Sequence, residues 1–197
     1  MRIFISGGCK NGKSYYAQRL ALGQGKTPLY YIATMRPVDD EDVARIARHV
    51  SEREGYGFVT IEQPADIAEV LGKSDHDGSF LLDSLTALLA NEMFLPDGSI
   101  NGGAGTKITD DLALVLNKVK SVVVVSDFIF SDAEARSPLT EAYMKALAAI
   151  DRAAAELCDA VIEIAYSNII VHKGAGSDVG TRYSGRQKGM QAYEALF

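Results

Sequence analysis

The stretch GGCKNGKS, from Gly7 to Ser14, decides the fold of this 197-residue chain. It follows the apolar segment MRIFIS and precedes YYAQRLAL, so it joins a predicted strand to a predicted helix. Its glycines, lysine and serine complete the pattern G-x-x-x-x-G-K-[ST], in which successive backbone N–H groups point at phosphate oxygens. A glycine-rich turn that only connects strand to helix is the alternative. The strand–turn–helix context favours a nucleoside triphosphate site.

The residues of this loop have separate expected roles. Lys13 is predicted to reach the β- and γ-phosphates and to be catalytic, and Ser14 to hold Mg²⁺. The other nucleotide-binding residues predicted in the loop are Gly7, Gly8, Cys9, Lys10, Asn11 and Gly12. The motif specifies triphosphate binding, of GTP or ATP, but not the reaction.

Composition limits the class of protein. A net charge of −6 and a pI near 5.1 argue against a general nucleic-acid surface, which needs an excess of Lys and Arg. No apolar run approaches the ~20 residues that span a bilayer, so no membrane span and a cytoplasmic location are predicted. Cys9 and Cys158 lack metal-type spacing and are expected to be reduced and unpaired.

Apolar segments alternate with helical segments along the chain. Strands are predicted at Arg2–Ser6, Pro28–Ala33, Phe58–Gln63, Ser79–Ser84, Val122–Asp127 and Ala160–Tyr166. Helices are predicted at Lys13–Leu22, Asp40–Arg53, Thr86–Met93, Lys107–Lys120 and Pro138–Cys158. Strands of this kind, separated by helices, predict an α/β fold with a mainly parallel sheet and helices on both faces, P-loop NTPase-like and RecA-like.

The chain is expected to form one domain with a tail. At 47% hydrophobic residues, positions 1–175 are sufficient for a single P-loop α/β domain. Residues 176–197 are Gly-rich and then weakly helical. They form a disordered tail, a partner-binding arm or a lid, and the sequence does not choose between these.

Two carboxylates are predicted near the phosphates, because ligands gather at the carboxyl ends of parallel strands. Asp83 ends the apolar segment SFLLD, where a carboxylate meets the Mg²⁺ of a phosphate loop. The alternative is a helix N-cap, since Asp is common there. Asp127, after VVVVS, carries the same two interpretations.

A second constellation lies in the predicted helix that starts near Asp40. Arg45, His49 and Arg53 are spaced four apart and share one face. Two guanidinium groups beside an imidazole disfavour its protonation, which suits a nucleophile for phosphoryl or nucleotidyl transfer. The alternative is a solvated face whose arginines pair with nearby glutamates.

The motifs together resemble the adenosylcobinamide kinase / adenosylcobinamide-phosphate guanylyltransferase family of cobalamin biosynthesis. The resemblance rests on GGCKNGKS, YIATMRPVDDEDVARIARHVSER, LLDSLTALLANEMF and VVVVSD. By position, it implies that His49 becomes covalently guanylylated, and that Arg45 and Arg53 stabilise the transferring group. It also implies site roles for Lys13, Ser14, Thr34, Asp83 and Asn91. A homotrimer, Mg²⁺, GTP or ATP as co-substrate, and adenosylcobinamide or its phosphate as substrate are implied too.

The chain departs from this family pattern after Ser126. The family usually has Asn-Glu where this chain has Asp127 and Phe128. Its Phe-Arg-Asp is replaced by Tyr143, Met144 and Lys145, and its Asn-Gln by Asp151 and Arg152. These changes alter hydrogen-bonding chemistry and charge as well as size. Two other hypotheses therefore stay open: a small-molecule P-loop kinase without nucleotidyl transfer, and a degenerate nucleotide-binding regulatory protein.

Overall fold

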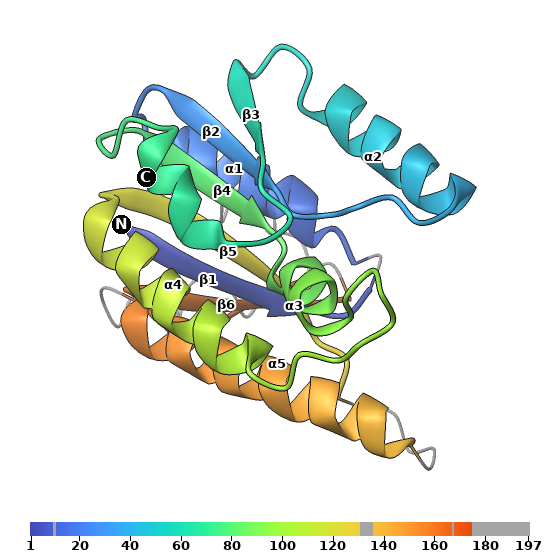
Figure 1. The fold of residues 1–197 in the computed structure, drawn as a ribbon. Helices are drawn as coiled ribbons and strands as arrows, with labels where there is room; N and C mark the ends of the chain where they lie inside the picture. The colour runs from blue at the N-terminus through green and yellow to red at the C-terminus, as the bar shows by residue number, and fades with distance from the viewer. Residues whose placement is uncertain (10, 131–135, 167, 175–197) are drawn as a thin grey trace.

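The computed structural model describes residues 1–9, 11–130, 136–166 and 168–174 (Figure 1). Lys10 and the predicted tail at 176–197 lie outside these residues. The chain forms one seven-stranded sheet in the order β3-β2-β4-β5-β1-β6-β7. The strands are β1 (Arg2–Gly7), β2 (Leu29–Ala33), β3 (Phe58–Glu62), β4 (Ser79–Asp83), β5 (Ser121–Asp127), β6 (Ala160–Ala165) and β7 (Asn168–Lys173).

The sheet is mainly parallel, as the sequence predicts. Strands β1 to β6 pair in parallel, and only the pair formed by β6 and β7 is antiparallel among the described strands. In β5 the run from Val122 to Val125 is buried on both faces, which explains why it lacks period-two alternation. Strand β7 was not predicted, because its residues are half exposed at the sheet edge and follow β6 without a strong turn signal.

Helices cover both faces of this sheet, which confirms that prediction. Helix α1 (Lys13–Gly23) packs on one face, and α3 (Leu85–Met93), α4 (Ala104–Lys118) and α5 (Pro138–Leu157) pack on the other (Figure 1). A short 3₁₀ helix, η1 (Ile67–Gly72), lies beside α4. Helix α4 starts three residues before the predicted Lys107. Two separate apolar cores, one on each face, hold the sheet in place.

Helix α2 (Asp40–Glu52) differs from the others. It leaves the end of β2 and stands away from the sheet before the chain returns to β3 (Figure 1). None of its residues, all of which the structure describes, is buried. The Asp39 side chain accepts a 2.8 Å hydrogen bond from the N–H of Asp42, and acidic residues fill the first turn. Local capping and charge–dipole attraction therefore stabilise this helix more than core packing does.

The strand order determines what meets at the carboxyl edge of the sheet. Strand β5 lies between β1, which enters the phosphate loop, and β4, which ends in Asp83. This arrangement is RecA-like, as predicted. It brings the loop, Asp83, Asp127 and the segment after Ala33 to one edge. In the described part of the chain, no helix is long and apolar enough to cross a membrane.

Candidate active site

The phosphate loop between β1 and α1 is held by close contacts beneath it. A Cβ at Gly7 would collide with the carbonyl oxygen of Ile164 on β6, so only glycine fits there. Gly12 has φ +88°, in the left-handed region that favours glycine. The Asn11 side chain donates to the Ile164 carbonyl oxygen and accepts from the Lys13 N–H at 3.3 Å. The loop is therefore built into the sheet before any ligand binds.

Lys13 lies at the start of α1 with its side chain only 6% exposed. Its ammonium donates to the carbonyl oxygen of Gly8 at 2.6 Å and forms an ion pair with Asp127 Oδ1 at 2.7 Å. Asp127 thus reaches the loop from the end of β5, as predicted, although its pairing with Lys13 was not predicted from the sequence. It also caps no described helix, so the N-cap interpretation of Asp127 is wrong.

Asp83 ends β4, next to the loop edge. Its carboxylate accepts a 2.8 Å hydrogen bond from the hydroxyl of Tyr31. Burial raises the pKa of Tyr31 far above its usual value, and the charge and hydrogen bond of Asp83 add to this, so Tyr31 remains a donor. The N-cap of α3 is Ser84, whose side chain accepts from the Ala87 N–H, so the N-cap interpretation of Asp83 is wrong.

Thr34 is fully buried just beyond β2. Its hydroxyl donates to the carbonyl oxygen of Ser84 at 2.8 Å and accepts from the Ser84 N–H at 2.7 Å. The Asn91 side chain donates to the carbonyl oxygens of Thr34 at 2.7 Å and Pro64 at 3.0 Å. Thr34 is not among the described residues that line the two cavities below. These contacts join the ends of β2, β4 and α3 around the site.

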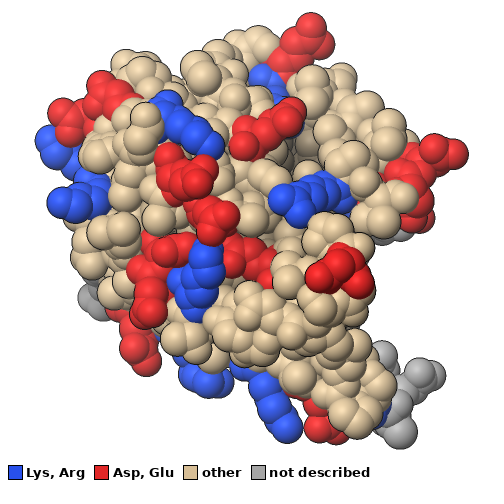
Figure 2. Space-filling model, in the orientation of Figure 1, with Lys and Arg blue, Asp and Glu red and all other residues tan. Residues whose placement is uncertain are grey.

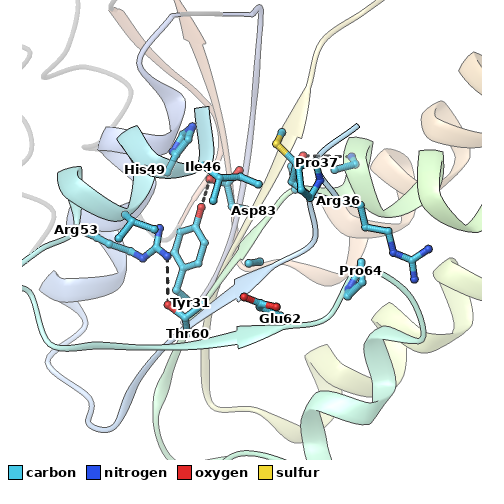
Figure 3. A pocket seen from close by; sticks show the side chains of 15 residues that line it. Tyr31, Arg36, Pro37, Ile46, His49, Arg53, Thr60, Glu62, Pro64 and Asp83 are labelled. Carbon is cyan, nitrogen blue, oxygen red and sulfur yellow. Dashed lines mark hydrogen bonds between the residues drawn. The ribbon is translucent and has the colours of Figure 1, made fainter. Parts of the chain in front are cut away.

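Two adjoining cavities open at this edge. The smaller, about 230 Å³, lies over the phosphate loop and is lined by Ser14, Lys13, Asp127 and other residues. The larger, about 380 Å³, lies between α2 and the strands β2 and β3 (Figure 3). Four residues line both cavities: Met35, His49, Asp83 and Ser84.

His49 stands at the boundary of these cavities, on the face of α2 turned toward Asp83 (Figure 3). Its side chain is 22% exposed, and its Nδ1 lies 3.8 Å from Glu52 Oε2. The three basic residues predicted to share one face, Arg45, His49 and Arg53, do not all line the same cavity. Arg45 lines the smaller cavity, and Arg53, which follows the last residue of α2, lines the larger one.

The two arginines have different partners. Arg45 forms ion pairs with Asp42 at 3.5 Å and Glu41 at 3.8 Å, as the solvated-face alternative expected for Glu41. The Arg53 guanidinium lies over the Tyr31 ring, 4.1 Å from its centroid, and donates to Thr60 Oγ1 at 3.3 Å. Arg53 is thus oriented by a cation–π contact, whereas Arg45 is held by ion pairs within its own helix.

Comparison with known proteins identifies the chain. Residues 3–168 match the CobU family, described as cobinamide kinase / cobinamide phosphate guanyltransferase. The chain belongs to this family. It is therefore an enzyme of the transferase class, and the resemblance stated from the sequence is confirmed.

Curated relatives agree with this assignment. The bifunctional adenosylcobalamin biosynthesis protein CobP of Pseudomonas aeruginosa is 30% identical over 162 residues, covering 82% of this chain and 91% of that protein. CobU of Escherichia coli is 33% identical over 95 residues, 48% of this chain and 51% of that protein. CobU of Salmonella typhimurium is 32% identical over 106 residues, 50% of this chain and 53% of that protein.

Several residues that line the cavities of this CobU-family protein were missed by the sequence analysis. They are Tyr31, Met35, Arg36, Arg48 and Glu62. Arg48 precedes His49 in α2 and lines the smaller cavity, while Glu62 ends β3 and lines the larger cavity. Position at a strand end was the available signal for Glu62, the same signal that selected Asp83. For Tyr31 no such signal exists, because it lies within the strand.

A group of half-buried polar residues lies beside Asp127 at this end of the site. The Asp127 N–H donates to Thr86 Oγ1 at 2.8 Å, and the Tyr143 hydroxyl donates to the Thr86 carbonyl oxygen at 2.9 Å. Burial raises the pKa of Asp151 on α5 to about 7; the Ser126 hydroxyl opposes this rise and the charge of Asp127 adds to it. Two acidic side chains, Asp127 and Asp151, therefore lie close enough at this end of the site to influence each other.

Charges on the surface are mixed. Figure 2 shows basic and acidic side chains interspersed over the face seen in Figure 1. Within the described residues of that face there is no broad basic area of the kind that holds a nucleic-acid backbone. The smaller cavity itself is lined by cations and anions together: Lys13, Arg45, Arg48, Glu52, Asp83 and Asp127.

Proposed function

We propose that this enzyme phosphorylates adenosylcobinamide and then transfers GMP from GTP to adenosylcobinamide phosphate through a guanylyl-histidine. The observation that carries the proposal is the place of His49. It lies on the boundary between the phosphate-loop cavity and the larger cavity, with Asp83 lining both. A triphosphate on the loop can therefore extend toward an imidazole nucleophile without leaving the site.

The kinase step is assigned to the phosphate loop. The terminal hydroxyl of the aminopropanol arm attacks the γ-phosphorus, a P–O bond to the substrate forms, and the bond to the nucleoside diphosphate breaks. Loop N–H groups and Lys13 hold the phosphates in line and balance their charge. The chemistry asked of the protein here is mainly positional and electrostatic.

A Mg²⁺ ion fits the donors at this edge. The Ser14 hydroxyl and the Asp83 carboxylate both line the smaller cavity, and hard oxygen donors suit this ion. Among the described residues no group of three or more His, Cys, Asp or Glu side chains forms a metal site, so phosphate and water oxygens would complete the coordination. When bound, Mg²⁺ neutralises charge on the phosphate oxygens. Tyr31 orients Asp83 for this role by its hydrogen bond.

The guanylyl step is assigned to α2. A neutral nitrogen of His49 attacks the α-phosphorus of GTP, a P–N bond forms, and pyrophosphate leaves with its bonding electron pair. The phosphate of the cobinamide phosphate then attacks the same phosphorus and releases His49. Arg45 on one side and Arg53 on the other stabilise negative charge on the transferring group.

The larger cavity suits a guanine ring. Apolar walls are supplied by Met35, Ile46 and Val50, and the Glu62 carboxylate lines the same space. A carboxylate accepts from the N1–H and amino group of guanine, whereas the matching edge of adenine offers an acceptor at N1. GTP is therefore the proposed donor for the second step.

Incubation with α-labelled GTP and Mg²⁺, followed by mass analysis of the peptides, tests the proposal. The expected result is an acid-labile GMP adduct on the peptide that contains His49, and its loss in His49→Asn. Unmodified protein that still binds GTP and phosphorylates cobinamide would favour the kinase without nucleotidyl transfer. Intact GTP binding with neither turnover would favour a regulatory protein. The homotrimer, the single domain at 1–175 and the cytoplasmic location stay predictions.

A further inference from the structure

We propose that Asp127 is a positioning residue for Lys13, one that holds the lysine ammonium until a triphosphate takes it over and so makes tight binding depend on Mg²⁺. The inference starts from the ion pair between Lys13 Nζ and Asp127 Oδ1, which lie 2.7 Å apart in the wall of the smaller cavity. The inference rests on the proposed function only in requiring that a triphosphate binds on the loop.

The lysine is held away from water by two contacts. Its side chain is 6% exposed, while the Asp127 side chain is 33% exposed and lines the cavity. An ammonium group has three N–H donors, and the contacts with Gly8 and Asp127 use two of them. A phosphate oxygen that claims the ammonium has to compete with a full carboxylate charge.

Asp127 is fixed in place on both sides by its backbone. Its own N–H donates to Thr86 Oγ1 at 2.8 Å, and the N–H of the next residue, Phe128, donates to the carbonyl oxygen of Gly7 at 2.8 Å. Gly7 also lies opposite Asp127 in the register of β1 and β5. The carboxylate therefore remains beside the loop when Lys13 turns toward a ligand.

On the side of α5, Asp127 faces two groups that are held toward their neutral forms. Burial raises the pKa of Asp151 and of Tyr143, and the charge of Asp127 adds to both shifts. Lys13 is on the loop side, and Arg45 and Arg48 line the same cavity from α2. Once Lys13 is shared with a phosphate, Asp127 becomes a less well balanced anion next to the ligand.

The repulsion between Asp127 and a ligand grows with the ligand's charge. A metal-free triphosphate carries up to four negative charges, and the Mg²⁺ complex two fewer. Asp127 therefore weakens binding of the metal-free form more than binding of the complex. An asparagine at this position retains an oxygen for Lys13 but removes the charge.

The test is the affinity of Asp127→Asn for GTP with Mg²⁺ and with EDTA, measured by calorimetry beside the wild type. We expect the variant to bind metal-free GTP at least about tenfold more tightly and Mg²⁺–GTP within about threefold of the wild type. Asp159→Asn is the matched control. It removes the same charge from an ion pair, with Arg2 at 3.0 Å, at the other end of β1. Its ratio of the two affinities should equal that of the wild type.

Two outcomes would overturn the inference alone: an unchanged Mg²⁺ preference in Asp127→Asn, or equal weakening of both forms, which marks a structural residue. A wild type that binds no triphosphate would overturn the proposed function as well. Thermal denaturation checks that the variant folds. If it does not, Asp127→Ser, which also removes the charge and keeps an oxygen, is measured in its place with the same expected result.

Discussion

The phosphate loop and helix α2 face each other across one site but are built in opposite ways. The loop is carried by β1 and α1, where Ile3, Ile5 and Ala17 are fully buried. Helix α2 buries none of its described residues, and its Val43 is 55% exposed. Core packing therefore sets the geometry of the phosphate loop. The position of His49 depends instead on the Asp39 cap, on the ion pairs of Arg45, and on the contact of Arg53 with Tyr31, which is itself hydrogen-bonded to Asp83.

This contrast suits the proposed function, in which the enzyme acts on two phosphorus atoms of a triphosphate. A packed loop would hold the β- and γ-phosphates in one place. A helix with few core contacts adjusts its position at small cost in free energy, because local stability follows buried apolar contact.

Loss of the loop lysine should affect both reactions. In Lys13→Met we expect cobinamide phosphorylation and guanylyl transfer to fall by about a thousandfold or more, on the order of 4 kcal/mol, because the phosphates lose a buried cation. Steady-state assays of both steps measure this. Lys120→Met is the control, since Lys120 is an exposed lysine paired with Asp77. A variant that loses only one activity would show that the two steps do not share the loop.

Ionisation of Asp151 should lower the free energy of unfolding as the pH rises. Burial holds the folded-state pKa of Asp151 at about 7, against 3.8 for an ordinary carboxyl. The group's contribution to stability is therefore complete below pH 4 and is lost as the pH rises through 7. Asp151→Asn removes this dependence, so at pH 8 we expect the variant to be more stable by on the order of 3 kcal/mol.

Urea unfolding of both proteins at pH 4.5 and pH 8 checks this prediction. The difference between variant and wild type should be larger at pH 8, whatever other groups titrate. The same difference at both values would mean that Asp151 is ionised in a solvated position. Asp151 would then not count as a buried ionisable group on the loop side of the site.

Much of the loop side could be predicted from the sequence, because its signals are local. The motif from Gly7 to Ser14 fixes a strand–turn–helix, and the run from Val122 to Val125 marks a buried strand. Asp83 was identified by its place at a strand end. What local patterns could not supply was Asp127 as the partner of Lys13, since a strand-end Asp has several uses and only the strand order shows which neighbour it meets.

The α2 side was predicted less well, because its geometry depends on contacts distant in sequence. The four-residue spacing of Arg45, His49 and Arg53 correctly indicated a helix but suggested one shared face. Instead Arg53 follows the last residue of α2 and stacks on Tyr31 of β2. The four-residue spacing places side chains on one face only within a helix. Because α2 ends at Glu52, Arg53 is outside the helix, and no sequence signal marked this end. Strand β7 was also missed. It is an edge strand that pairs only with β6 among the described strands, so its residues are not buried and lack a strong apolar pattern.

The hydrogen bond from Tyr31 to Asp83 links the two sides. In Tyr31→Phe the ring beneath Arg53 remains but the carboxylate loses its donor. We expect the Mg²⁺ concentration for half-maximal kinase activity to rise about tenfold, near 1.4 kcal/mol, within the range for a hydrogen bond to a charged group. Tyr30→Phe is the matched control, because its hydroxyl accepts from the Asp75 N–H away from the cavities. Equal Mg²⁺ requirements in both variants would separate Tyr31 from the metal site.

The smallest effect is predicted for a valine-to-alanine substitution in α2, compared with the same substitution in the core of the sheet. Val123→Ala in β5, where the side chain is fully buried, should cost about 2 kcal/mol in the free energy of unfolding. Val43→Ala should change it by no more than about 0.5 kcal/mol, and toward greater stability, because alanine is the better helix former and little apolar area is lost. Urea titrations measure both. A cost above 1 kcal/mol for Val43→Ala would mean that α2 is covered in solution, and the contrast between a packed loop and an exposed helix would then apply only to the isolated chain.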